Sequence, residues 1–222
     1  MWLAKYLTDL PQIQTKLRLV LHDTLSAAKD ENRLFTLEEI RRAKLPYLDA
    51  VIEEMLRINA VTVTREALCD TTILGCPIQK GTQVFFVSNG PGFLSPSIPI
   101  DDDSKRSETS RAGKISATWD ETRDMTLFDP ERWLVRKNDD GKRGLLADNV
   151  DFDGGTGPQL VFGLGPRACW GRRLAYMEMK TIIAMLVWKF RLLATPPALS
   201  SHAGLEGIAR VPQQCYLRLS KI

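Results

Sequence analysis

The sequence predicts a mainly α-helical protein that carries small β-sheets. Apolar residues recur at helical spacing over residues 2–56, and again directly after residue 171. Between residues 61 and 87, glycine and proline interrupt β-branched and aromatic side chains, which is the pattern of short strands joined by tight turns. With 222 residues, of which 44% are hydrophobic, the chain can bury a core and could form one large domain or two small ones.

The composition indicates which kinds of binding partner and which cellular compartment to expect. The net charge of +3 does not indicate a nucleic-acid partner, because such a partner needs basic residues gathered on one face, and none is expected. Four cysteines without a tight pairing pattern, and no secretory signal, favour a reducing, intracellular compartment. No apolar run reaches the roughly 18 residues of a membrane span, so no membrane anchor is expected in this chain.

Helices are predicted through most of the first 57 residues. The first, over residues 2–10, is amphipathic from its start with no capping residue in front, so we expect it to be the end of a longer helix. Pro11 opens a second helix that runs to about residue 28. Thr36 and Glu39 form a capping-box pattern that opens a short helix, and Pro46 opens the next one.

The residue pattern in the middle of the chain changes from strand-like to polar and then to irregular. Short strands are predicted at residues 61–67, 71–74 and 82–87. Residues 90–122 are rich in proline, glycine, serine and charge, so we expect a surface insertion that is mobile. Residues 134–160 show little periodicity, and we expect a long irregular segment there.

The C-terminal part is predicted to hold one long helix and a small sheet. Apolar residues at helical spacing follow Gly171 for about 20 residues, and we expect Pro196 and Pro197 to end that helix. Residues 208–219 alternate weakly, which favours one or two closing strands.

The stretch FGLGPRACWG, residues 162–171, carries the chemistry. A cysteine binds iron as a thiolate, and the start of a helix stabilises that negative charge with its free N–H groups and partial positive charge. Cys169 lies just before a predicted helix, so we interpret it as the axial ligand of a haem iron. Gly165 and Gly171 would let the backbone approach a flat macrocycle without a side-chain clash.

Two neighbours of the cysteine suit the same role. Arg167 would pair with a haem propionate, and Phe162 would shield the sulfur from water. The alternative is a buried core cysteine beside a surface arginine. The coincidence of five positions at fixed offsets favours the haem ligand. The other cysteines, at positions 69, 76 and 215, are expected to be small buried hydrophobes rather than ligands.

The stretch at residues 162–171 resembles the haem-binding signature of the cytochrome P-450 superfamily. Two further stretches resemble the family in the same order: EMLR, residues 54–57, and FDPERW, residues 128–133. The resemblance implies that Glu54, Arg57 and Arg132 form a buried salt-bridge triad behind the haem-binding loop. Without the other stretches, EMLR alone would be read as an exposed ion pair. Arg65 stands where the family often has a second propionate-binding arginine.

The resemblance covers the proximal, C-terminal half of the family fold. Residues 2–11 look like the end of the family's long distal helix, whose proton-delivering threonine would lie upstream of Met1. Residues 1–222 are therefore expected to be a single truncated domain of this fold, without the N-terminal half and most of the substrate pocket. The resemblance also implies that the complete protein is anchored to the endoplasmic reticulum membrane.

The resemblance implies a haem-thiolate monooxygenase that inserts one oxygen atom from O2 into a small apolar organic substrate. The thiolate favours O–O cleavage, and electrons come from an NADPH-dependent reductase at the proximal face. Arg172 and Arg173 are candidate docking charges for that acidic partner, or they solvate the helix start. Two alternatives remain open: a haem-thiolate isomerase or dehydratase that needs no reductase, and a non-catalytic, truncated haem-binding fragment.

Overall fold

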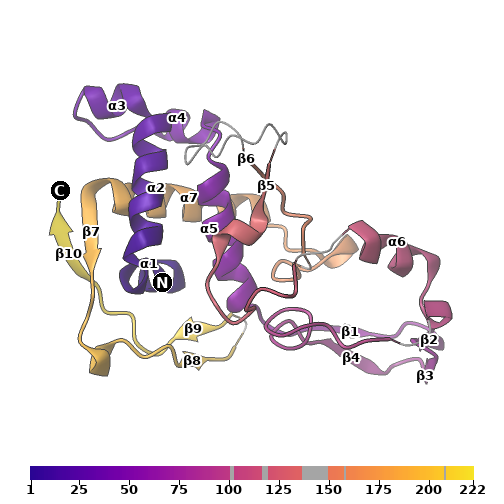
Figure 1. Cartoon of the computed structure of the whole chain (residues 1–222). Coiled ribbons are helices and arrows are strands. Elements are labelled where there is room, and N and C mark those ends of the chain that lie inside the picture. The colour runs from indigo at the N-terminus through magenta and orange to yellow at the C-terminus, as the bar shows by residue number, and fades with distance from the viewer. Residues whose placement is uncertain (101–102, 117–119, 137–149, 158, 208) are drawn as a thin grey trace.

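The computed structural model describes residues 1–222 except 101–102, 117–119, 137–149, 158 and 208. Helices α1 to α5 and α7 gather in one part of the molecule, and a ribbon of paired strands, β1 to β4, projects from that part with helix α6 above it (Figure 1). The long helix α7 crosses behind α2 and α5 in this view. The predicted fold class, mainly α with small β-sheets, is confirmed.

The helical part contains most of the core. Its helices are α1 (Trp2–Asp9), α2 (Pro11–Thr24), α3 (Ser26–Asp30), α4 (Leu37–Arg42), α5 (Pro46–Ile58) and α7 (Arg172–Lys189). Leu7, Leu17, Ile52 and Val187 come from four of these helices and are completely buried in one apolar cluster. Segments that are far apart in sequence therefore share one core, which fixes α5 against α7.

The helix boundaries follow the local signals closely. Thr36 accepts a hydrogen bond from the Glu39 N–H, and the Glu39 side chain accepts one from the Thr36 N–H, so the predicted capping box is present. Pro11 and Pro46 stand in the first turns of α2 and α5. The helix predicted to run from Pro11 to about residue 28 is divided at Leu25, which has a non-helical backbone, into α2 and α3.

The strands form two-stranded antiparallel sheets in the described part of the chain. The first set is β1 (Val63–Glu66) with β4 (Gln83–Phe86), and β2 (Thr71–Ile73) with β3 (Cys76–Ile78). Near the C-terminus, β7 (Phe190–Leu193) pairs with β10 (Arg218–Lys221), and β8 (Gly204–Leu205) pairs with β9 (Val211–Pro212). The predicted strands at 61–87 and near the C-terminus are thus present.

Several details differ from the sequence prediction. The expected insertion contains regular secondary structure, the turn Asp103–Lys105 and helix α6 (Glu108–Ser116), while its mobility stays a prediction. The segment expected to be irregular contains the pair β5 (Leu134–Arg136) and β6 (Val150–Phe152). Helix α7 ends at Lys189, before the two prolines, because the chain turns there into β7 to pair with β10.

The prediction that three cysteines are buried was wrong for two of them. Cys69 and Cys76 are exposed, and Cys215 is half-buried. Cys69 follows β1, and Cys76 opens β3 in the projecting ribbon, where the two-stranded sheet of β2 and β3 has all its residues exposed except Ile78. All four cysteines carry free thiols.

Candidate functional site

The Cys169 loop, residues 159–171, is a tight turn held by backbone hydrogen bonds. The Cys169 N–H donates to the Phe162 carbonyl at 2.7 Å, and the Ala168 N–H donates to the Gly165 carbonyl at 3.0 Å. A short 3-10 turn, Gly165–Arg167, lies between them. The loop is closed by main-chain atoms, so the Cys169 side chain is left exposed at the surface.

Two glycines make this turn possible, and only one of them was singled out from the sequence. Gly165 has φ of 70° and Gly163 has φ of 65°, a left-handed region that residues with a Cβ rarely adopt. Gly171 was expected to share this role, but its φ is −78°, which any residue adopts. It instead stands at the N-cap of α7, and a Cβ there would meet the Cys169 sulfur at an ordinary 3.9 Å.

Helix α7 begins directly after the cysteine. The Arg172 N–H donates to the Cys169 carbonyl at 3.3 Å, and the Ala175 N–H donates to the Gly171 carbonyl at 2.9 Å. Cys169 therefore lies within one turn of the helix start, as the sequence predicted. Arg167 is exposed on the same loop, and the Phe162 ring is half-buried below it, 5.4 Å from the Tyr176 ring.

Arg65 joins the loop from the projecting ribbon. A Cβ placed on Gly163 would lie 3.3 Å from an Arg65 guanidinium nitrogen, so the two segments are in contact range. The Arg65 side chain is half-buried, and one of its N–H groups donates to the Thr64 carbonyl at 2.8 Å. Two arginines, Arg65 and Arg167, thus come to the loop from different elements.

Glu54 on α5 is the centre of a buried ionic network. Both oxygens of its carboxylate accept hydrogen bonds from Arg57, each at 2.8 Å, in a bidentate pair. Arg132 donates to the same carboxylate at 3.3 Å. The side chains of Glu54 and Arg57 are 0% exposed and that of Arg132 is 2% exposed. The structure therefore brings together the three residues predicted to form the triad.

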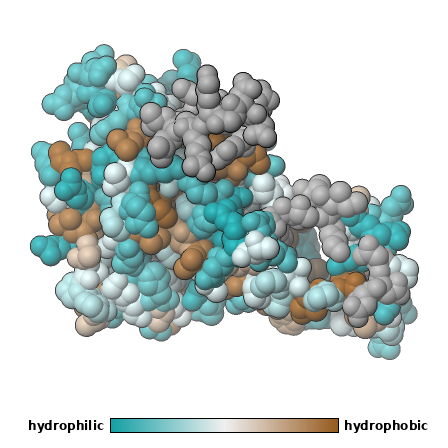
Figure 2. Space-filling view, in the orientation of Figure 1, coloured by the Kyte–Doolittle hydropathy of each residue, from teal (hydrophilic) through white to brown (hydrophobic). Residues whose placement is uncertain are grey.

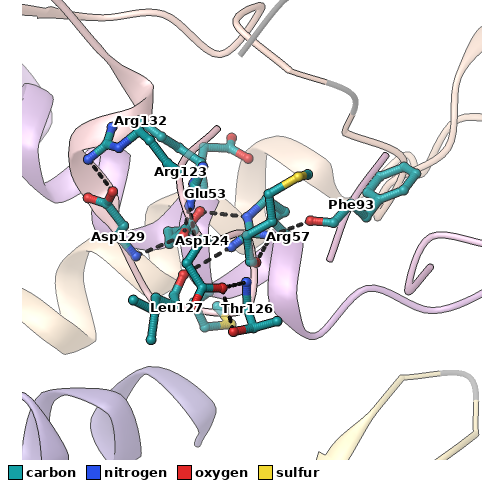
Figure 3. A network of polar contacts seen from close by, with 12 residues as sticks. Glu53, Arg57, Phe93, Arg123, Asp124, Thr126, Leu127, Asp129 and Arg132 are labelled. Carbon is teal, nitrogen blue, oxygen red and sulfur yellow. Dashed lines mark hydrogen bonds and ion pairs between the residues drawn. The ribbon is translucent and has the colours of Figure 1, made fainter. Parts of the chain in front are cut away.

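Backbone carbonyl groups complete this network. Arg57 donates to the carbonyl groups of Phe93 and Met125, and to that of Leu127 at 3.2 Å. Met125 and Leu127 belong to the segment 124–132. Figure 3 shows the Arg57 guanidinium among residues of that segment. Arg132 donates to the Asp124 carbonyl at 3.1 Å. A single buried guanidinium thus ties α5 to Phe93, near the start of the 90–122 insertion, and to the segment that follows the insertion.

Four residues of the site were not found from the sequence. The Trp133 indole N–H donates to Glu54 at 2.9 Å. Glu53, Gln159 and Tyr176 form a second polar cluster beside the Cys169 loop. The tryptophan was detectable in principle, because a buried indole N–H needs an acceptor and Trp133 stands in the FDPERW stretch. The other three lie on three separate segments, and nothing in their spacing relates them.

Large apolar side chains lie exposed on and near the loop. Trp170 is 103% exposed and Leu164 is 62% exposed. On β4, which pairs with the strand of Arg65, Phe85 is 58% exposed. Figure 2 shows apolar residues on the surface of both the helical part and the projecting ribbon. Exposed apolar groups next to arginines suit a ligand that is flat, apolar and anionic at its edge.

Comparison with known families identifies the class of protein. A sequence model described as Cytochrome P450 matches residues 1–90 and 124–217. Because that match includes both the Cys169 loop and the Glu54 network, the class is a haem-binding oxidoreductase. The chain belongs to the cytochrome P450 family, and membership implies a haem cofactor.

Similar proteins are named as monooxygenases of that family. The chain is 43% identical to cytochrome P450 monooxygenase TRI13 of Fusarium sporotrichioides over 100% of its own length and 39% of that protein's length. It is 40% identical to the cytochrome P450 monooxygenase cyp3.1 of Dothistroma septosporum, covering 99% of this chain and 71% of that protein. The chain spans about two fifths of TRI13, so the activity of the whole protein is a matter for proposal.

Solved structures agree in fold. The crystal structure of cytochrome P450 CYP102L1 matches with a TM-score of 0.66 at 23% identity, covering 100% of this chain and 41% of that one. A zebra fish cytochrome P450 structure with progesterone matches with a TM-score of 0.63 at 21% identity, covering 40% of that chain. The likeness shows a partial cytochrome P450 fold for this chain.

The residues present fit a haem group. The exposed Cys169 thiol offers a single axial ligand, and Arg65 and Arg167 offer cations for the two carboxylates at the edge of the ring. Within the described residues, no group of three or more His, Cys, Asp or Glu side chains is placed to hold a bare metal ion. In the same part of the chain, no helix is both long and apolar enough to cross a membrane.

Proposed function

We propose that this chain is the haem-ligating part of a haem-thiolate monooxygenase, with Cys169 as the axial ligand of the iron. The observation that carries the proposal is the exposed thiol on a loop closed by its own backbone at the start of α7, in a chain of the cytochrome P450 family. Bound haem supplies the chemistry by which one oxygen atom of O2 is inserted into an organic substrate.

Each residue of the site has a separate task in this proposal. Free N–H groups at the start of α7 stabilise the negative charge of the thiolate. Arg65 and Arg167 bind the propionates, and Phe162 covers the sulfur from the protein side. Gly163 and Gly165 keep the backbone low enough for a flat ring to approach. Glu54, Arg57 and Arg132 hold the scaffold behind the loop and take no part in the chemistry.

Haem titration tests the ligand directly. We expect the purified chain to take up haem and, after reduction and exposure to carbon monoxide, to show a strongly red-shifted Soret band. Cys169→Ala is expected to abolish that band, whereas Cys69→Ala, which removes an exposed thiol on another element, is expected to leave it unchanged. Failure of the wild-type chain to bind haem would overturn the proposal for this chain.

The substrate and the electron source form the finer part of the proposal. The proposed substrate is a small apolar organic molecule, and the proposed electron source is an NADPH-dependent reductase. The names of the relatives, which are monooxygenases, support this reading. Product formation without any reductase would instead support the isomerase or dehydratase alternative. If the haem-loaded chain gives no product, the third alternative, a truncated fragment without turnover, is supported. The exposed apolar side chains of the loop are consistent with that alternative.

The proposed reductase contact lies beside the Cys169 loop. A groove of about 540 Å³ runs between α4, α5 and α7, and its lining includes Arg41, Arg172, Arg173 and Lys180. We expect Arg173→Glu to weaken binding of an acidic reductase and to flatten its salt dependence, because a rim charge acts on long-range attraction. Arg218→Glu, an equally exposed reversal on β10, serves as the matched control.

An intracellular location is part of the proposal, and the four free thiols support it. Anchoring of the complete protein to the endoplasmic reticulum membrane is also proposed. Fluorescence microscopy of the full-length protein tests both statements.

A further inference from the structure

Glu53, the residue before the triad glutamate, has its own set of partners. Its side chain lies on α5 and the residue is only 4% exposed. One carboxylate oxygen accepts a hydrogen bond from the Tyr176 hydroxyl, and the other accepts one from the Gln159 side-chain amide at 2.8 Å. Both donors are neutral groups, in contrast to the guanidinium groups around Glu54.

The two donors stand at the beginning of the Cys169 loop and just after its end. Gln159 is the first residue of the loop, and its side-chain amide oxygen accepts a hydrogen bond from the Val161 N–H at 3.4 Å. Tyr176 lies in the second turn of α7, after the cysteine. Its ring packs on Phe162, the residue whose carbonyl receives the Cys169 N–H. One carboxylate therefore holds the segment that enters the loop and the helix that leaves it.

The buried position of Glu53 makes its hydrogen bonds costly to break. Burial raises the pKa of this carboxyl group, while the hydrogen bonds from Tyr176 and Gln159 and the nearby Arg172 oppose that rise. Asp49, one turn earlier on α5, raises the pKa further. A buried polar group that loses its hydrogen-bond partners is destabilising, so Glu53 holds Gln159 and Tyr176 more firmly than an apolar side chain of the same size could.

We propose that Glu53 is a positioning residue that fixes the Cys169 loop on α5 through Gln159 and Tyr176. It does not touch the cysteine. It acts by holding both sides of the turn, so that the thiol is presented in one place. The statement about the loop stands on the contacts alone, and its consequence for iron ligation rests on the proposed function.

Amide hydrogen exchange of the haem-free chain tests the loop itself. The Cys169 N–H is protected by its bond to the Phe162 carbonyl, so its exchange reports opening of the turn. In Glu53→Ala the loss of two hydrogen bonds is expected to accelerate that exchange about tenfold. Exchange in β1 and β4, on the projecting ribbon, is expected to stay as in the wild type.

Two further variants keep the test decisive if Glu53→Ala does not fold. Tyr176→Phe and Gln159→Ala each remove one donor without changing α5, and each is expected to accelerate Cys169 exchange by a smaller factor than Glu53→Ala. Glu53→Gln keeps the shape and one acceptor oxygen, so it is expected to restore part of the protection. Wild-type exchange rates at Cys169 in folded Tyr176→Phe and Gln159→Ala proteins would overturn the proposal.

The spectrum of the haem-loaded chain separates this proposal from the proposed function. If Glu53 positions the ligand, Glu53→Ala loaded with haem shows a lower share of the red-shifted carbon monoxide band than the wild type, and Glu53→Gln regains part of it. Glu178→Gln, an exposed carboxylate on α7, is the matched control and leaves the share unchanged. Faster exchange at Cys169 in a chain that never binds haem would support the loop anchor and refute the haem site.

Discussion

Glu53 and Glu54 are neighbours on α5, yet they hold two different regions of the molecule by different means. Successive residues of a helix point about 100° apart, so the two carboxylates face different segments. Glu54 faces Arg57, Arg132 and Trp133, and binds the 124–133 segment through one guanidinium group and an indole N–H. Glu53 faces the Cys169 loop and binds it through an amide and a hydroxyl.

The two regions therefore differ in how firmly they are held: one by a buried ionic network, the other by neutral hydrogen-bond donors. A buried charge that loses its partner is costly, so the Glu54 network is satisfied as one unit or not at all. Breaking a hydrogen bond from a neutral donor costs less free energy than leaving a buried charge unpaired. The loop that these donors hold carries the exposed thiol of Cys169.

The largest effect is expected at the ionic network. Glu54→Ala leaves Arg57 without its bidentate carboxylate and takes away an acceptor of Arg132, both inside the protein. We expect a loss of about 3–5 kcal/mol in the free energy of unfolding. Urea denaturation followed by circular dichroism measures it, with Glu178→Ala as the exposed control. A loss as small as that of the control would show that the network does not stabilise the fold.

A single neutral contact to the same carboxylate should matter less. Trp133→Phe keeps an aromatic ring in the core and removes the indole N–H that donates to Glu54 at 2.9 Å. Because the acceptor keeps its other donors, we expect a loss of about 1–3 kcal/mol in the free energy of unfolding. Thermal unfolding of both variants measures which one loses more stability. A larger loss for Trp133→Phe than for Glu54→Ala would contradict the prediction.

The loop region is tested by a pair of glycines. Gly163→Ala forces a Cβ into a backbone with φ of 65°, and we expect about 1–2 kcal/mol of local strain. Gly171→Ala meets an ordinary backbone and is expected to have little effect. Hydrogen exchange at the Cys169 amide distinguishes them. Equal effects of both substitutions would mean that the positive φ is not what shapes the turn.

The smallest effect concerns pH and the cap of α4. Hydrogen bonds from Arg33, and then from the Thr36 N–H, lower the pKa of Glu39 from 4.5 to about 2. Because the folded-state pKa is depressed, this contribution is present above the unfolded pKa and is lost as pH falls towards 2. We expect amides of α4 to lose protection over that range. Glu39→Gln preserves the capping box and should remove the pH dependence.

Local signals in the sequence predicted the elements and the turn before α7 well. The capping box at Thr36, the prolines that open α2 and α5, and the glycine-bounded loop before α7 all act within a few residues. Such signals can be read directly, because the interacting groups are close in the sequence. The EMLR and FDPERW stretches predicted the grouping of Glu54, Arg57 and Arg132 through family resemblance alone.

What could not be predicted depends on packing between distant segments. The partners of Glu53 lie 106 and 123 residues away, and no spacing rule joins them. Helix α7 was predicted to end at its prolines, but pairing of β7 with β10 ends it earlier. Gly163 and Gly171 look equivalent in the sequence, and only the backbone angles tell which one the turn requires.

The Cys169 loop is closed by the amide of the cysteine, and not by its side chain. The shape of the turn and the chemistry of the ligand are therefore separable properties of one residue. A serine or a histidine at position 169 can form the same backbone bond and present an oxygen or a nitrogen in place of sulfur. The side-chain atom that the loop presents at position 169 can therefore be changed while the backbone hydrogen bond that closes the turn is kept.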